Sequence, residues 1–116
     1  ESFREHGFLL GHAGVIGIPE AFPMIQYLEH LFAFCAAESC GKCFPCRLGS
    51  VRGREMCAKA RDGGYRMDPQ LMRDLLDTMQ DGSLCELGGG LPLPIRNILE
   101  HFEDELEAYF EPRAAP

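Results

Sequence analysis

The sequence predicts an all-α fold, a bundle of four amphipathic helices behind a short strand-like tail. Apolar residues recur at helical spacing in four segments, and the stretches between them are short and rich in glycine, proline and aspartate. The chain has 116 residues, which is enough for one domain with a modest core. Helices with short connections pack against their neighbours, so these observations favour a bundle.

The tail covers residues 1–18. Its stretch FLLGHAGVIGI combines three regularly spaced glycines with Val15 and Ile16, which favour a strand. One strand cannot form a sheet, so the tail is expected either to pack on another element or to belong to a larger protein. A phosphate-binding loop is the alternative for the glycine run. The run lacks the Walker lysine and the dinucleotide spacing, so turns and a bulge are the favoured interpretation.

The first two helices are predicted over residues 19–37 and 46–60. Pro19 suits a first helical position, and Glu20 is favourable in a first turn. The sequence RDGGYR ends the second helix. The apolar positions of the two helices are Met24, Ile25, Leu28, Leu31, Phe32 and Cys35, and then Leu48, Val51 and Met56.

The last two helices are predicted over residues 69–82 and 94–110. Asp68 is expected to cap the third helix, with Pro69 at its first position. The sequence ELGGGLPLP is expected to be a loop before the fourth helix. The apolar stripes are Leu71, Met72, Leu75, Leu76 and Met79, and then Ile95, Ile98, Leu99, Phe102, Leu106, Tyr109 and Phe110.

Charge and hydropathy exclude several classes of function. The net charge is −7, with seven basic and three acidic residues over positions 38–66 but three basic and eleven acidic residues over positions 67–116. The acidic half argues against nucleic acid as a partner. No apolar run approaches the roughly 20 residues of a membrane helix, and the first residues do not resemble a signal peptide. A cytoplasmic protein without membrane insertion is therefore expected.

Six cysteines indicate metal binding or redox chemistry, because disulfides are rare in the cytoplasm. Cys40, Cys43, Cys46 and Cys85 form the pattern C-x2-C-x2-C-x38-C. A 4Fe–4S cubane takes one thiolate per iron, and a tight loop can supply three of the four. The spacing therefore predicts that these four cysteines bind a 4Fe–4S cluster, with Cys85 folded back onto the other three.

Neighbouring residues suit such a cluster. Gly41 permits tight wrapping, Pro45 stiffens the loop, and Cys46 begins a helix whose dipole stabilises a thiolate. The basic residues of the segment would offset the charge of an anionic cluster. The residues expected to tune the cluster are Lys42, Arg47 and the backbone amides of Gly88, Gly89 and Gly90.

The cysteines admit other interpretations. A zinc-stabilised interaction module without a redox role is the main alternative, although zinc usually takes two separated C-x2-C pairs. The sequence CFPC resembles a thiol–disulfide motif but lacks the strand–helix context. The radical S-adenosylmethionine spacing, C-x3-C-x2-C, is not present. Cys35 and Cys57 are interpreted as core residues, and the four histidines show no ligand spacing.

The sequences ESCGKCFPCRLG and LCELG resemble the C-terminal region of the flavoprotein subunit of NADH dehydrogenase (complex I). The diaphorase subunits of NAD-linked hydrogenases and formate dehydrogenases are related to it. The family motif E-S-C-G-x-C-x-P-C-R-x-G is matched at every fixed position over residues 38–49. LGHAGVIGI resembles the end of the ubiquitin-like domain that precedes the helical domain in the family. CFPCRLGSVRG leans toward the formate dehydrogenase branch.

The resemblance implies a tail over residues 1–18 and a helical 4Fe–4S domain over residues 19–116. It implies a one-electron relay between a flavin and NAD(H) site and downstream redox centres of an NAD-linked oxidoreductase. In the family, flavin mononucleotide and NAD bind an upstream domain, and nothing in this chain matches that domain. The chain is therefore expected to have no catalysis of its own and to have the other domains or subunits of the complex as partners.

Overall fold

Helices make up nearly all of the regular structure in the computed structural model, which describes residues 2–8 and 11–112. No β-strand occurs in this described part, where one isolated bridge joins Met67 to Phe110. The elements in chain order are α1 (Ser2–Glu5), α2 (Met24–Glu38), α3 (Phe44–Asp62), α4 (Pro69–Gly82), α5 (Glu86–Gly90), α6 (Pro92–His101), α7 (Glu103–Leu106) and a 3-10 turn, η1 (Glu107–Tyr109).

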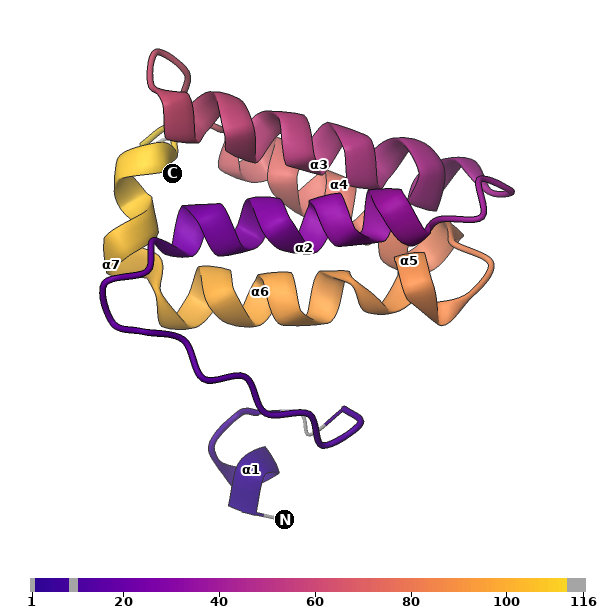
Figure 1. The fold of residues 1–116 in the computed structure, drawn as a ribbon, viewed down its shortest axis with the longest axis horizontal. Coiled ribbons are helices and arrows are strands. Elements are labelled where there is room, and N and C mark those ends of the chain that lie inside the picture. Colours follow the sequence, from indigo (N-terminus) through magenta and orange to yellow (C-terminus); the bar gives the residue numbers. More distant parts are fainter. Residues whose placement is uncertain (1, 9–10, 113–116) are drawn as a thin grey trace.

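The predicted all-α class is confirmed, whereas the predicted four-helix bundle holds only in part. Helix α2 lies between α3 and α6, and α4 lies behind the α2–α3 pair (Figure 1). The short helices α5 and α7 complete the two ends. Most of the largest fully buried side chains come from α2, α4 and α6 and from the segment before α4, and they include Phe32, Ile25, Leu28, Met67, Met72, Leu76, Met79 and Ile95.

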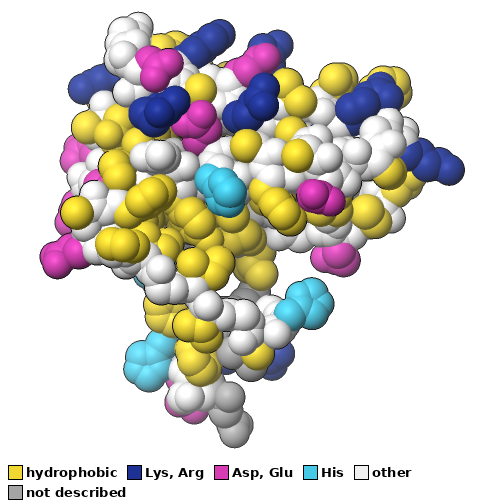
Figure 2. Space-filling view, viewed as in Figure 1, with side chains coloured by type: hydrophobic (Ala, Val, Ile, Leu, Met, Phe, Trp, Pro, Cys, Tyr) yellow, Lys and Arg dark blue, Asp and Glu magenta, His cyan; other side chains and the backbone are white. Residues whose placement is uncertain are grey.

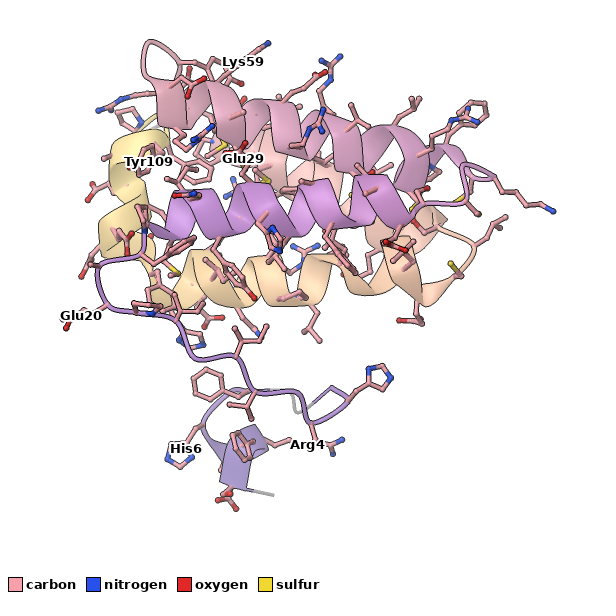
Figure 3. The ribbon with its side chains drawn as sticks, in the orientation of Figure 1. Arg4, His6, Glu20, Glu29, Lys59 and Tyr109 are labelled. Atoms are coloured by element: carbon pink, nitrogen blue, oxygen red, sulfur yellow. The ribbon has the colours of Figure 1, made fainter. Side chains whose placement is uncertain are left out.

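Two glycines of α3 allow its neighbours to approach closely. A Cβ atom built on Gly53 would overlap the ring of Phe32, which is fully buried on α2. A Cβ atom on Gly49 would lie 2.7 Å from Cγ of Met79 on α4. Near the far end of α3, Arg61 pairs with Glu29 of α2 (Nε to Oε2, 2.8 Å), and Figure 3 shows Glu29 between the two helices. Helix α3 is therefore held against both α2 and α4.

The start of α2 differs from the prediction. The helix begins at Met24 rather than at Pro19, since Pro23 occupies the N-cap position with an extended backbone (φ −66°, ψ 127°). A proline also disfavours helical geometry in the residue before it, so Phe22 stays outside the helix. Pro23 has no side-chain donor or acceptor, and the N–H of Met24 instead donates to the carboxylate of Glu105 (2.8 Å).

The last predicted helix, residues 94–110, is also wrong as one element. Helix α6 begins earlier, at Pro92, and ends at His101, because Phe102 leaves helical geometry (φ −120°, ψ 31°). This break turns α7 across the N-terminus of α2, where Leu106 is buried and Glu105 accepts the Met24 N–H. The predicted loop ELGGGLPLP is likewise wrong, since it contains α5 and the start of α6.

The bounds of the other two helices follow the sequence closely, although the expected apolar positions Leu48, Val51 and Leu71 are exposed. The carboxylate of Asp68 accepts the N–H groups of Gln70 (2.7 Å) and Leu71 (3.4 Å), so it caps α4 as predicted. Helix α4 ends at Gly82 as predicted, and α3 begins two residues before the predicted position 46. Local signals were therefore sufficient where the cap and the proline lie next to each other.

The tail has neither helix nor strand over residues 13–19 and is exposed except at Ile18, which is half-buried against the core, and Val15 is 95% exposed. The strand expected at Val15 and Ile16 is absent from the described residues, and Leu9 and Leu10 of the quoted stretch lie outside them. The ring of Phe8 packs against that of His101 at the end of α6, with the two ring planes tilted by 30° and the centroids 4.5 Å apart. None of the described helices has the length and apolar character needed to cross a membrane.

The glycines of α3 lead to a stability prediction. Gly53→Ala should lower the free energy of unfolding by about 1–3 kcal/mol, because the new methyl group overlaps a buried ring that has no room to move. Gly49→Ala should cost less, because the flexible thioether of Met79 can shift away. Thermal and denaturant unfolding of the two variants would measure the difference. Equal destabilisation would contradict the prediction.

Candidate metal centre

The cysteines of the predicted site lie at one end of the helical domain. Cys40 and Cys43 belong to the loop between α2 and α3, and Cys46 lies in the first turn of α3. Cys85 directly precedes α5. Figure 1 shows the α2–α3 loop and α5 at the same end of the molecule. The fold therefore brings the distant Cys85 segment to the end that carries the other three.

The segment from Gly82 to Gly88 runs along the segment from Cys43 to Cys46. A Cβ atom on Gly82 would lie 2.8 Å from Cγ of Pro45, and a Cβ atom on Gly88 would lie 2.6 Å from Cβ of Cys46 and 3.0 Å from its sulfur. Between these two contacts, the backbone N–H of Leu84 interacts with the sulfur of Cys43. Cys85 is thus flanked on both sides by residues that touch the loop of the other three cysteines.

Backbone N–H groups from two segments influence the sulfur of Cys43. The N–H group of Leu84 is the largest cause of a lowered pKa at the Cys43 thiol, and the N–H group of Cys46 is the second. Arg47 makes a smaller contribution of the same sign. Cys43 is also the N-cap residue of α3. These donors favour the thiolate, which is the form that binds metal.

The sulfur of Cys46 is buried and has two polar neighbours. Its side chain is 4% exposed, and its sulfur lies 3.3 Å from Oγ of Ser39 and 3.9 Å from the sulfur of Cys35. When Cys46 is a thiolate, it can only accept, so Ser39 and Cys35 must be the donors. Position 46 is in the first turn of α3, where the helix dipole also stabilises negative charge.

The loop before α3 is fastened by its own residues. Gly41 has a positive φ of 76°, and its N–H donates to Oγ of Ser39 (3.2 Å). The guanidinium of Arg47 donates to the carbonyl of Gly41 (2.8 Å) and lies over the ring of Phe44, 4.7 Å from its centroid. Gly41 and Arg47 therefore act on the shape of the loop, in addition to the charge that the sequence assigned to Arg47.

The other residues expected to tune the cluster, Lys42, Gly88 and Gly89, have different surroundings in the structure. Lys42 is exposed, and Gly89 donates its N–H to the carbonyl of Cys85 (3.0 Å) within the short α5 turn. Gly88 contributes a close contact with Cys46. The amide with the largest effect on a cysteine pKa is that of Leu84, which the sequence did not indicate.

The four cysteines of the site differ in their exposure to solvent. Cys40 and Cys85 are exposed, Cys43 is half-buried and Cys46 is buried. Figure 2 shows lysine and arginine side chains along the edge formed by α3, in agreement with the basic segment of the sequence. Among the described residues, no group of three or more histidine, cysteine, aspartate and glutamate side chains is placed to hold a single metal ion.

Cys35 is a core residue, as predicted, but its proximity to Cys46 was missed. Burial, followed by the neighbouring Cys46 sulfur, raises the pKa of the Cys35 thiol to about 12. Its sulfur also lies 3.7 Å from the carbonyl oxygen of Leu87. Helical spacing placed Cys35 on the buried face of α2 but did not indicate which part of α3 that face would contact. Cys57 is fully buried in α3, and burial raises its pKa to about 12 as well.

The residues present fit an anionic cluster with thiolate ligands. The hydroxyl oxygen of Ser83 is buried and has no hydrogen-bond partner among the described residues. A Cβ atom on Gly88 would lie 2.6 Å from this oxygen and 2.6 Å from Cβ of Cys46, so the hydroxyl is close to the cysteines. A buried hydroxyl without a partner costs about 1–3 kcal/mol, and an acceptor bound beside Cys46 would remove that cost.

Comparison with known proteins agrees with this chemistry. The sequence model of the NADH-ubiquinone oxidoreductase-F iron-sulfur binding region matches residues 26–109, which include all four cysteines of the site. Over its full length, this chain is 32% identical to the NADP-reducing hydrogenase subunit HndC of Solidesulfovibrio fructosivorans and 32% identical to an NADH-quinone oxidoreductase subunit of Rhizobium meliloti. It spans 24% and 28% of those two proteins, respectively.

A solved structure has the same helical arrangement. The crystal structure of an NAD+-reducing NiFe-hydrogenase in the H2-reduced state matches 83% of this chain with a TM-score of 0.72 and 28% sequence identity. The match covers 17% of the hydrogenase chain. The similarity therefore concerns one part of a much longer polypeptide.

Gly88 and Gly89 provide a matched test of the site. Gly88→Ala should reduce the iron bound after anaerobic reconstitution by about half or more, because its methyl group would push the Cys85 segment away from Cys46. Gly89→Ala should bind as much iron as the unsubstituted chain, since the nearest atom to its Cβ is a backbone oxygen at 3.7 Å. Iron analysis of the two variants would measure the difference in bound iron. Equal iron binding would show that the Gly88 contact does not position the site.

Proposed function

This chain belongs to the family of the NADH-ubiquinone oxidoreductase-F iron-sulfur binding region, and we propose that it relays single electrons within an NAD-linked oxidoreductase. Its cofactor is a 4Fe–4S cluster. We assign the four ligands to Cys40, Cys43, Cys46 and Cys85. The relay would connect a flavin and NAD(H) site with downstream redox centres.

The observation that carries this proposal is the placement of Cys85. The N–H group of Leu84 lowers the pKa of the Cys43 thiol, and Gly88 packs against Cys46, so the segment that carries Cys85 lies beside two of the other three cysteines. Four cysteines from two such segments match the one thiolate per iron that a cubane requires. Cys57, by contrast, is buried in the body of α3.

The chain's own residues would hold and adjust the cluster. Backbone N–H groups of Leu84 and Cys46 would stabilise the Cys43 thiolate, and the hydroxyl of Ser39 would donate to Cys46 once Cys46 is a thiolate. Hydrogen bonds to ligand sulfurs and nearby positive charge raise the reduction potential of such a centre. When bound, the cluster supplies one-electron transfer, because it alternates between two oxidation states.

The partners in this proposal are the other domains or subunits of the oxidoreductase. The chain spans about a quarter of the length of its curated relatives, and flavin mononucleotide and NAD belong to the parent protein. The exposed Cys40 and Cys85 lie near two exposed apolar side chains in the same segments, Phe44 and Leu84. We propose that this end faces the partner and that the chain alone does not oxidise NADH.

Two finer points remain predictions. The sequence CFPCRLGSVRG favours a formate dehydrogenase, whereas the relatives described above include a hydrogenase subunit and a quinone oxidoreductase subunit. A cytoplasmic location is proposed from the cysteines, since none of the six is paired in a disulfide and disulfides are rare in the cytoplasm.

The cofactor content tests the function directly. The chain purified without exposure to air should be brown and contain about four irons and four sulfides per molecule. Metal and sulfide analysis, together with a visible spectrum and electron paramagnetic resonance of the reduced protein, would measure this. One zinc per chain and no visible absorption would instead support a structural zinc module without a redox role.

The ligand assignment can be tested with two cysteines outside the C-x2-C-x2-C group. Cys85→Ser should lose the cubane or degrade it to a three-iron form. Cys57→Ser should retain the full iron content and spectrum, since Cys57 lies eleven residues beyond Cys46 on α3, or about 16 Å along the helix axis. Iron analysis and the visible spectrum report both outcomes. The opposite behaviour of the two variants would reject the assignment of Cys85.

A further inference from the structure

A fifth thiol lies directly beside the proposed ligand Cys46. Cys35 is on α2, is 1% exposed, and its sulfur lies 3.9 Å from that of Cys46. The Cys35 sulfur also lies 3.7 Å from the carbonyl oxygen of Leu87 and interacts with the side chain of Ser50. Cys35 lies outside the C-x2-C-x2-C-x38-C pattern and therefore has no role in the ligand set.

The chemistry of metal binding decides which of the two sulfurs carries the proton. A cysteine that binds iron does so as a thiolate, so Cys46 has no proton to donate once it is a ligand. A thiol is a weak donor, and a thiolate is a better acceptor than a neutral group. The S–H group of Cys35 therefore favours the charged Cys46 sulfur over its neutral neighbours, the Leu87 carbonyl and the Ser50 hydroxyl. The Ser50 hydroxyl itself donates to the carbonyl of Cys46 (2.6 Å).

We propose that Cys35 is a positioning residue whose S–H group donates a hydrogen bond to the sulfur of Cys46 and thereby raises the reduction potential of the cluster. This inference rests on the proposed function, because it requires Cys46 to be a ligand. Reduction adds negative charge that the four thiolate sulfurs share. A donor aimed at one of these sulfurs stabilises the reduced form more than the oxidised form.

The donor reaches Cys46 independently of the loop. The hydroxyl of Ser39 also points to Cys46, but Ser39 lies beside the loop that Gly41 and Arg47 shape. Cys35 lies within the α2 helix, which packs along α3. The S–H donor is therefore fixed by helix packing, and exposed changes in the loop should leave it in place.

The test compares the reduction potential of three reconstituted variants with that of the unsubstituted chain. Cys35→Ala should keep four irons, but its potential should fall. The expected fall corresponds to a change of about two- to tenfold in the ratio of reduced to oxidised cluster, at most about 59 mV for one electron. Cys35→Ser should recover part of the shift, because its hydroxyl is also a donor. Cys57→Ala, which removes an equally buried thiol from the same helix pair, should leave the potential unchanged.

Infrared spectroscopy gives a second measurement that does not require any change at position 35. With four cysteines bound as thiolates, Cys35 and Cys57 are the two remaining S–H groups of the chain. In the assembled Cys57→Ala chain the single S–H stretching band belongs to Cys35. This band should lie at lower frequency than the Cys57 band, which only the assembled chain without the substitution shows, because a hydrogen bond to a thiolate weakens the S–H bond.

Each outcome has a distinct meaning. An unchanged potential in Cys35→Ala with four irons present, or a Cys35 S–H band at a frequency no lower than that of Cys57 in the assembled chain, would overturn the inference and leave the proposed function intact. Loss of iron from a folded Cys35→Ala variant would also overturn it, since Cys35 would then be needed to hold the cluster rather than to adjust its potential. If the unsubstituted chain assembled no four-iron cluster, the proposed function itself would fail.

Discussion

The contact between Gly88 and Cys46 is the constraint on which the site depends. It joins the short helix α5 to the first turn of α3, and a Cβ atom on Gly88 would lie closer to Cys46 than two carbon atoms normally approach. The same direction of approach places Gly82 on Pro45 and the N–H of Leu84 at Cys43. Because glycine occupies both ends of this segment, Cys85 can lie between two backbone contacts rather than on a free loop.

Two further glycines on α3 also permit close contacts, and these contacts connect the site to the core. Gly53 accepts the ring of Phe32 from α2, and Gly49 accepts the thioether of Met79 from α4. The close packing of α2 and α3 that begins at Phe32 continues to Cys35, one turn further along α2, and so brings that thiol to Cys46. The environment of a ligand sulfur is therefore set by helix packing that begins outside the site.

Local signals in the sequence predicted the parts of the fold that local interactions decide. Asp68 and Pro69 fixed the start of α4 because a cap and a first-turn proline act on their own neighbours. Pro19 was misleading, because Pro23 and the distant Glu105 together determine where α2 begins. The break at Phe102 could not be predicted either. It depends on the packing of Leu106 and Glu105 against α2 rather than on the preferences of the residues around it.

In the candidate site too, some features could be predicted from the sequence and others depend on tertiary packing. The spacing of the cysteines and the glycines near Cys85 could be recognised in the sequence, because they depend on covalent spacing and on the absence of a side chain. The amide of Leu84, the hydroxyl of Ser83 and the thiol of Cys35 could not, because each acts only after two segments distant in the sequence have met. Spacing thus identifies groups that can bind a metal, whereas tertiary packing decides which donors surround them.

The two sides of the candidate site differ in their exposure to solvent. Cys46 is buried, with Ser39 and Cys35 beside its sulfur, whereas Cys40 and Cys85 are exposed. Electrostatic effects are stronger on the buried side, where water is excluded. A cluster held by these four cysteines would therefore have its potential adjusted mainly from the side of α2 and α3. If the proposed relay operates, the exposed Cys40 and Cys85 would lie on the side open to a partner, and the potential would be adjusted mainly from the buried side.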